Sequence, residues 1–396
     1  MIDINLSRTL KTVLDAPNLI YLAFISVFLP YYVTAAVIIV TGLYLLISRN
    51  TRGLIFVHRG RGVFLVFTLY TAVVALVFQN YIGLACSAGF FLIIVISYYA
   101  RSIMTEEIFE KGLDICCFAA IPLGLAAAVE KIINLADEGY RCKLWFFNEN
   151  YFCAIMAAVI IACAFKATSH RGGVLIYYIC ALFAGVAMYL GESLFAFVEL
   201  FVGIFVLLIL KRKHTLLAIF LMLVVFCMLA IYFVPEIMPR LAESNVTSDR
   251  RVRIWNTAMQ FIGENPFFGR GFLSYFQLAG MNPKVYQTTH AHNFALEPLI
   301  SFGIVGTLLL IIFMWTYYEK VTECKELLRS NHATTFILTI SAAIIAHATT
   351  DMTMLWIQTG LLYGLFLGGV GADEKTLNRR IQACLAKDET KNSQEE

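Results

Sequence analysis

Charged side chains are scarce in this sequence: Asp, Glu, Lys and Arg make up 14% of the 396 residues, against roughly 25% in ordinary soluble domains. The net charge of +3 is too small to indicate nucleic-acid binding. The ten cysteines have no spacing typical of a metal site, and most lie in apolar runs, where cysteine behaves as a small hydrophobic residue. These absences exclude a soluble enzyme, a nucleic-acid partner and a disulfide-rich secreted protein.

Apolar residues are abundant instead, at 60% of the chain. A helix needs about 20 mostly apolar residues to cross a bilayer, so this content matches about eleven or twelve spans. The sequence therefore predicts an all-α, polytopic integral membrane helical bundle of about 12 (11–12) transmembrane helices. The apolar runs lie at 18–48, 63–79, 81–100, 113–129, 151–165, 172–190, 194–210, 215–234, 292–318, 333–350 and 352–371.

The distribution of Lys and Arg predicts the orientation of the helices. One face collects 21 of the 30 basic residues, and the positive-inside rule assigns that face to the cytoplasm. The N-terminus lies on that face too only if the run 18–48, which contains Pro30, forms a hairpin of two helices. The total is then twelve transmembrane helices. The alternative is one kinked helix, which gives eleven. The predicted regions are N-terminal transmembrane helices (1–234), an extracytoplasmic catalytic loop (235–291), C-terminal transmembrane helices (292–371) and a solvated cytoplasmic tail from Asp373 (372–396).

The segment 235–291 is too long for a passive connection, so we expect a functional loop. Ser248 or Asp249 is a candidate N-cap for a short helix. Gly263 and Pro266 predict its end. Apolar residues recur at helical spacing between these limits, at Ile254, Ala258, Phe261 and Ile262.

Five of the 17 arginines lie in this one loop. On a helix, Arg250 and Arg253 share a face, and Arg251 lies one turn before Trp255 and is expected to contact it. Guanidinium groups bind phosphate through paired hydrogen bonds, which suits a lipid-linked diphosphate at a membrane surface. A solvated basic turn that contacts lipid headgroups is the alternative. The remaining two arginines of the loop are Arg240 and Arg270.

Two histidines, His290 and His292, close the loop. A neutral histidine at a membrane interface is a natural general base near pH 7. A hydrogen-bonded interfacial histidine and half of a metal site are the alternatives. The acids of the loop are scattered, so we expect no metal ion and expect arginines to neutralise a bound diphosphate. No other cofactor is indicated.

Four ionisable residues lie within apolar runs, where such groups are functional candidates. Glu297 lies one turn after Asn293, on the helix that leaves the histidines. His347 and Asp351 are four residues apart, and we expect them near the same outer surface. For Glu199 we expect a structural hydrogen bond between helices.

Several of these residues form motifs that resemble a known family. His292-Asn293, nine residues and Gly303-Ile-Val-Gly306 have the spacing of the signature of bacterial O-antigen ligases and O-antigen polymerases. RVRIW, with Arg251, is similar to the arginine-tryptophan helix of that family, and Pro266-x-x-Gly269-x-Gly271 is similar to its following turn. NENYF at 148–152 resembles the family's outer entry to a mid-chain helix.

The chain departs from the family pattern at two positions. Leu194 stands where many members have an arginine at the outer start of a mid-chain helix. Ser301 stands where many have an acid two residues before the first motif glycine. The missing arginine removes one expected phosphate contact, and Arg270 or Arg253 is a candidate to replace it.

The resemblance implies a membrane glycosyltransferase of the bacterial cytoplasmic membrane, with its active site facing outside. It would move a glycan from undecaprenyl diphosphate to an acceptor hydroxyl of another lipid-linked glycan (polymerase) or of an acceptor such as lipid A core (ligase). In this reading Arg251, helped by Arg250, Arg253 and Arg270, binds the leaving diphosphate. His292 is the base, Asn293 a positioning residue, and the motif glycines let helix 292–318 pack closely. Supporting residues are Glu297, His290, Trp255 and Asp351.

Two other classes stay open. A transporter or flippase of lipid-linked sugars would place its ionisable groups near the bilayer midplane, often in repeated halves. Here the polar residues gather in one outer loop and no internal repeat is visible. A non-catalytic membrane scaffold is the third class. The sequence contains no motif that separates polymerase from ligase or predicts an oligomeric state.

Overall fold

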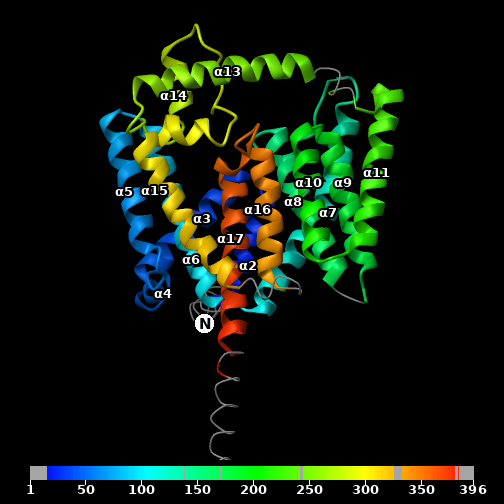
Figure 1. Ribbon diagram of the computed structural model, residues 1–396, viewed down its shortest axis with the longest axis horizontal. Coiled ribbons are helices and arrows are strands. Elements are labelled where there is room, and N and C mark those ends of the chain that lie inside the picture. Colours follow the sequence, from blue (N-terminus) through cyan, green and yellow to red (C-terminus); the bar gives the residue numbers. More distant parts are fainter. Residues whose placement is uncertain are drawn as a thin grey trace, which may run out of the picture.

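A computed structural model describes residues 16–137, 139–169, 172–238, 240, 244–324, 332–379 and 382. Over these residues the chain forms helices joined by turns, without a β-strand, which confirms the all-α prediction (Figure 1). Five helices are long and apolar enough to cross a membrane, or six if the bent pair α3–α4 counts as one span. The eleven or twelve spans stay a prediction. The five helices are α6 (Tyr81–Ile103), α7 (Glu106–Ile133), α8 (Glu149–Ser169), α11 (His214–Phe233) and α15 (Leu296–Glu323).

Shorter helices complete the bundle and the layer above it. Those in the bundle are α2 (Ala16–Ser26), α3 (Tyr31–Ile47), α4 (Arg49–Ile55), α5 (Arg61–Val77), α9 (Leu175–Gly191), α10 (Leu194–Leu210), α16 (Ala333–Ala348) and α17 (Ile357–Gly368). The others are α13 (Ser244–Glu264), α14 (Ser274–Met281) and the 3₁₀ turns η1 (Pro235–Ile237) and η3 (Thr353–Leu355). In Figure 1, α13 lies across one end of the bundle, which we call the α13 face.

The run 18–48 forms two helices that meet at the α13 face. α2 ends before Phe28, whose carbonyl accepts a hydrogen bond of 3.0 Å from the indole of Trp145. α3 begins at Tyr31, whose ring lies 5.6 Å from that of Trp356. From there α3 runs to α4, which bends from it by 100° at the opposite end of the bundle. The structure therefore contains the predicted hairpin and not one kinked helix.

α13 begins earlier than predicted and ends where predicted. The helix runs from Ser244 through the expected cap positions 248 and 249 and stops at Glu264, just after Gly263. Its apolar face is buried against α14 and α15 in one cluster, so the loop is a folded layer over the helix ends. This cluster contains Ile254, Ala258, Phe261, Tyr275, Leu278, Ala279, Ala291 and Ile300.

α15 breaks at Gly303, where φ is 62° and ψ is −170°. The break frees backbone groups, and the turn after α13 satisfies them. Ser301 O accepts a 2.7 Å hydrogen bond from the N–H of Gly271, and the N–H of Ile304 donates to Pro266 O at 2.9 Å. Backbone hydrogen bonds thus join the turn 266–271 to the glycine motif at 303–306.

This contact requires glycine on both sides. A Cβ at Gly303 would lie 2.4 Å from the carbonyl oxygen of Phe267, and one at Gly269 would lie 2.6 Å from the nitrogen of Gly303. The expectation that the motif glycines let helix 292–318 pack closely is met at Gly306, where a Cβ would lie 2.4 Å from the ring of Tyr70, whereas Gly303 has a different role. Gly303 lets the helix break, and Gly269 lets the turn 266–271 approach the break.

The packed chain also continues past residue 371. Asp373 is 2% exposed, and its carboxylate accepts hydrogen bonds from the backbone N–H groups of Ala333 (3.3 Å) and Thr334 (2.6 Å). Asp373 therefore satisfies free donors at the start of α16. The prediction of a solvated tail starting at Asp373 is wrong at this residue.

Candidate active site

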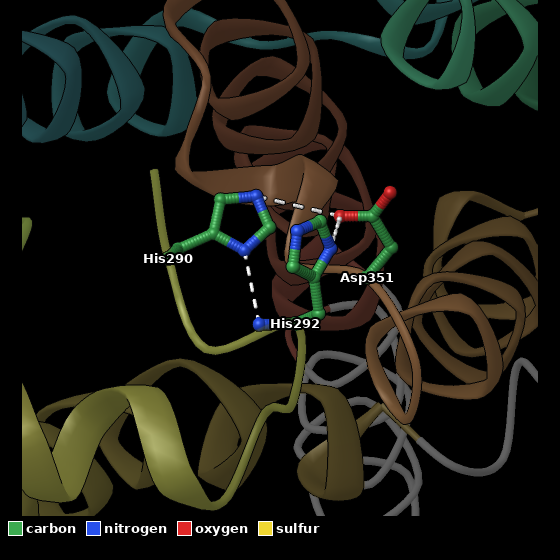
Figure 2. Close-up of side chains that lie close together, drawn as sticks. All are labelled: His290, His292 and Asp351. Carbon is green, nitrogen blue, oxygen red and sulfur yellow. Dashed lines mark hydrogen bonds and ion pairs between the residues drawn. The ribbon is translucent and has the colours of Figure 1, made fainter. Parts of the chain in front are cut away.

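Two loop histidines and one aspartate from a distant segment meet beneath α13 (Figure 2). Nδ1 of His292 lies 3.0 Å from Oδ1 of Asp351, and Nε2 of His290 lies 3.4 Å from the same oxygen. Asp351 follows α16 and lies at the same end of the bundle as the loop histidines. His290 and Asp351 are buried, whereas the side chain of His292 is 22% exposed.

The hydrogen bonds determine which nitrogen of His290 carries the proton. Its Nδ1 accepts a hydrogen bond of 3.1 Å from the backbone N–H of His292, so the ring proton lies on Nε2 and points to Asp351. Burial, and secondarily the charge of His292, lower the pKa of His290 to about 3. His290 is therefore a neutral donor near pH 7 and cannot itself be the titrating base.

Asp351 is ionised and orients His292. Burial by itself would raise the pKa of Asp351, but the hydrogen bond from His292 and the nearby histidine charges outweigh it, and the pKa lies well below its usual value. A carboxylate accepts, so Nδ1 of His292 donates and Nε2 keeps its lone pair. The hydroxyl of Thr288 lies 2.9 Å from Nε2. This arrangement suits a general base on the exposed edge of the ring.

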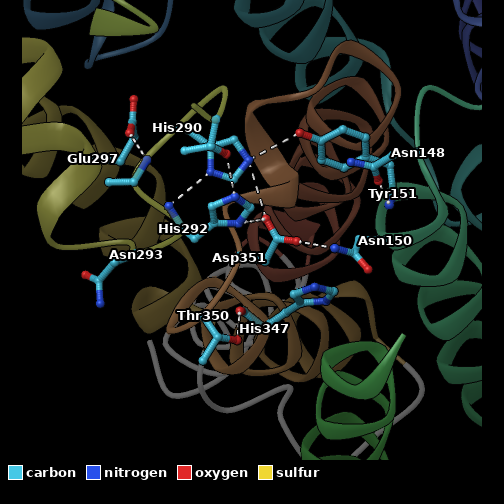
Figure 3. Close-up of polar contacts among 12 residues, drawn as sticks. Asn148, Asn150, Tyr151, His290, His292, Asn293, Glu297, His347, Thr350 and Asp351 are labelled. Atoms are coloured by element: carbon cyan, nitrogen blue, oxygen red, sulfur yellow. Dashed lines mark hydrogen bonds and ion pairs between the residues drawn. The ribbon is translucent and has the colours of Figure 1, made fainter. Parts of the chain in front are cut away.

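The entry to α8 supplies contacts that the sequence reasoning missed (Figure 3). The amide of Asn150 donates to Oδ2 of Asp351 at 2.7 Å, and the hydroxyl of Tyr151 lies 3.4 Å from Nε2 of His290. Both belong to NENYF at 148–152, the stretch whose family resemblance was the available signal. Thr288 carried no such signal.

Asn293 and Glu297 hold the histidine segment in position. Oδ1 of Asn293 accepts hydrogen bonds from the N–H groups of Ala295 (2.9 Å) and Leu296 (3.1 Å), which is a helix-capping arrangement. Glu297 accepts one hydrogen bond of 2.7 Å from the N–H of Ala291 and one of 3.0 Å from the hydroxyl of Ser301. Ser301, which stands where many family members have an acid, is thus a hydrogen-bond partner of Glu297.

Glu199 and His347 form a buried pair behind the site. Nδ1 of His347 lies 2.6 Å from Oε2 of Glu199, and neither side chain is more than 2% exposed. The pair joins α16 to α10, which is the structural contact expected for Glu199. The carbonyl of His347 also accepts a 3.0 Å hydrogen bond from the N–H of Asp351.

Arg251 is a predicted arginine that lies within electrostatic reach of Asp351. Its guanidinium lies 4.0 Å from the ring centroid of Phe195, so Phe195 and not Trp255 is its aromatic partner. Burial lowers the pKa of Arg251, and the Asp351 carboxylate raises it. Within the described part of the chain, Arg251 donates no hydrogen bond to another residue.

No contact among the described residues joins the other predicted residues of the loop to the histidines. Arg250 and Arg253 are exposed. Arg270 donates to Glu264 at 2.9 Å and lies 5.3 Å from the ring centroid of Phe78. Trp255 packs on the apolar cluster under α13, and its indole N–H has no partner among the described residues.

The three residues in Figure 2 also have donor atoms suited to a metal ion. One atom from each of His290, His292 and Asp351 lies within 4.8 Å of the others. The scattered acids of the loop therefore do not exclude a metal ion, because Asp351 comes from another segment.

Comparison with known proteins agrees with the geometry. The model of the O-antigen ligase family matches residues 156–311, about two fifths of the chain. The match includes Arg251, His292 and Gly303, while Asn150 and Asp351 lie outside it. No curated protein matches the chain at a significant level. The long apolar helices are those of an integral membrane protein, and residues 156–311 are similar to the O-antigen ligase family.

Proposed function

We propose that this protein is a glycosyltransferase of the bacterial cytoplasmic membrane. It transfers a glycan from undecaprenyl diphosphate to an acceptor hydroxyl at the outer face. The observation that carries the proposal is the pairing of Asp351 with His292, which leaves Nε2 of His292 as an acceptor, near an arginine that has no hydrogen-bond partner among the described residues. The family match supports the reaction class.

The reaction needs one base and one cation. Nε2 of His292 takes the proton of the acceptor hydroxyl while its oxygen attacks the anomeric carbon of the donor glycan. The bond between that carbon and the diphosphate oxygen breaks, and undecaprenyl diphosphate leaves with the electron pair. Arg251 neutralises the charge that develops on the leaving group. Asp351 stabilises the protonated His292.

The remaining arginines act less directly in this proposal. Arg250 and Arg253, on the exposed side of α13, attract the anionic donor and lipid headgroups toward the site. Arg270, which is paired with Glu264, adds to the positive electrostatic potential that attracts the donor. Arg251 is the residue that contacts the diphosphate.

The proposed reaction is metal-independent. His290, His292 and Asp351 already satisfy one another through hydrogen bonds, and arginine supplies the positive charge. Transfer by purified protein should therefore continue in excess chelator. Activity that is lost in chelator and restored by a divalent ion would assign the three residues to a metal instead.

Two observations test this function against a flippase of lipid-linked sugars. Protein reconstituted in vesicles with a glycan-loaded undecaprenyl diphosphate should release undecaprenyl diphosphate and form a glycosidic bond to an added glycan or lipid A core acceptor. Movement of intact donor between leaflets without bond formation would support the flippase. Cysteine labelling should find positions 250–290 outside and 211–214 inside, and the reverse would separate the site from an outer-face donor.

A further inference from the structure

A group of aromatic side chains lies beside the candidate base. The ring centroid of Trp356 lies 4.5 Å from that of Phe147 and 5.5 Å from that of Tyr151, with angles of 29° and 3° between the ring planes. Tyr31 adds a fourth ring, whose centroid lies 5.6 Å from that of Trp356. We call these four residues the aromatic platform.

The aromatic platform extends from the protein surface to the histidines. Phe147 is 46% exposed and Tyr31 is 41% exposed, whereas Tyr151 is buried. The hydroxyl of Tyr151 lies 3.4 Å from Nε2 of His290, the histidine that contacts Asp351 (Figure 3). The platform is therefore continuous with the candidate active site.

A hydrogen bond fixes the orientation of Trp356. Its Nε1 donates to Oε1 of Gln358 at 3.1 Å, and the buried Gln358 donates in turn to Val27 O at 3.0 Å and Leu29 O at 2.8 Å. The indole is thus tied to the turn between α2 and α3. Aromatic residues of an interfacial belt direct the polar end of the ring to the lipid headgroups. The N–H of Trp356 is instead engaged inside the protein.

A side-chain amide lies next to the rings. Oδ1 of Asn148 accepts a 3.0 Å hydrogen bond from the backbone N–H of Tyr151, and the amide nitrogen of Asn148 donates to none of the residues that the structure describes. A sugar can use both features, because its C–H groups pack on an aromatic face and its hydroxyls accept hydrogen bonds from an amide. A lipid chain would use the rings but not the amide.

The elements that form the platform favour the acceptor sugar as its occupant. Phe147 and Tyr151 belong to the entry to α8, and Trp356 directly precedes α17. Arg251, which binds the leaving diphosphate in the proposed function, lies over Phe195 at the start of α10. The platform contains no residue of α10 or α13. An acceptor on the platform therefore leaves the α10 side of the site to the diphosphate.

We propose that the aromatic platform and Asn148 form the binding subsite for the acceptor glycan, in which Phe147 and Trp356 stack on the sugar whose hydroxyl reaches His292. This inference rests on the proposed function, and it identifies the part of the protein that recognises the acceptor. The platform contains neither the base nor the arginine that binds the diphosphate. Loss of a ring should therefore weaken acceptor binding and leave donor binding unchanged.

The test measures equilibrium binding of lipid-free oligosaccharides to purified His292→Ala protein, which cannot transfer them. The probes are the glycan repeat unit released from its lipid by mild acid and the core oligosaccharide released from lipid A. Phe147→Leu in this background keeps an apolar side chain without the ring, so the tighter-binding probe should lose about three- to tenfold in affinity. Phe147→Tyr keeps the ring and should bind as the parent protein does. Tyr81→Leu removes an exposed ring beside the turn 266–271 and is the matched control, with no expected change.

Trp356→Leu is the second variant and should weaken binding as Phe147→Leu does. Parent affinity in both variants, or no binding of either probe to the parent protein, overturns the inference. An equal loss in Tyr81→Leu would show a general effect of interfacial rings and also contradicts it. So does a matching loss of affinity for the undecaprenyl diphosphate-linked donor in Phe147→Leu, which would assign the platform to the donor.

The outcomes also separate the two proposals. Wild-type protein that transfers glycan, with parent affinity in both ring variants, removes only the acceptor subsite. Oligosaccharide binding that depends on Phe147, in a protein whose wild type forms no glycosidic bond, removes the proposed function and leaves the platform as a glycan-binding site.

Discussion

Nδ1 of His292 and Oδ1 of Asp351 lie 3.0 Å apart, although 59 residues separate them in the chain. His292 ends the loop under α13, and Asp351 follows α16. The carboxylate determines which nitrogen of the imidazole keeps its lone pair, and it stabilises the imidazolium that proton transfer creates. The pair is thus the unit on which the base assignment depends.

Replacing either member of this pair should slow transfer without loss of the donor. His292→Ala removes the proton acceptor, and Asp351→Asn favours the wrong tautomer of His292, so each should lower turnover by roughly 10²–10⁴. The double variant should be little worse than either single one, because the two residues act as a unit. Turnover and donor affinity measured side by side check this, and wild-type turnover in His292→Ala would end the base assignment.

Replacing Arg251 should have the opposite signature. Arg251→Ala removes a charge-assisted contact worth about 1.5–3 kcal/mol, so donor affinity should fall together with turnover. Arg251→Lys should restore little, because an ammonium cannot reproduce the paired donors of a guanidinium. Equilibrium binding of the lipid-linked donor is the measurement, with Lys284→Ala as control. Unchanged affinity in Arg251→Ala would move the diphosphate site elsewhere.

Acid should destabilise the folded protein through His290. Its pKa is about 3 in the folded state and roughly 6.5 in an unfolded chain, so the unfolded state takes up the proton first. The stabilisation is complete above about pH 6.5 and is lost as the pH falls toward 3, by roughly 2 kcal/mol between pH 7 and pH 5.

His290→Gln keeps a donor for Asp351 but cannot take up a proton, so its stability should depend less on pH over this range. Thermal unfolding midpoints at pH 7 and pH 5, in the same detergent, compare the two proteins. An equal loss of stability in both would show that another group is responsible.

Gly303→Ala should damage the fold at the break in α15. The φ and ψ of Gly303 lie in a region that is almost exclusive to glycine, so strain alone costs about 1–3 kcal/mol. The added methyl group also meets the backbone at Phe267. Gly89→Ala is the matched control, because Gly89 is helical with open space around it, and alanine there should stabilise by about 0.4–1 kcal/mol. A Tm for Gly303→Ala equal to that of wild type would contradict the account of the break.

Much of the local structure followed from the sequence. Runs of apolar residues predict helices because each helix satisfies its own backbone in lipid, and Gly263 and Pro266 predict the end of α13 for equally local reasons. His292, Arg251 and the glycine motifs were identified by spacing within one continuous segment. Such patterns describe one element at a time.

The contacts between elements required the tertiary structure. Asn150 and Asp351 are 201 residues apart and share a 2.7 Å hydrogen bond, and Arg251 lies over Phe195 instead of its helical neighbour Trp255. The sequence shows the two glycine motifs separately. It does not show that the helix breaks at Gly303 and receives the turn 266–271 at the break. Periodicity determines which face of a helix is apolar, whereas the packing of the whole bundle determines which helix ends meet, and the candidate site is built from those ends.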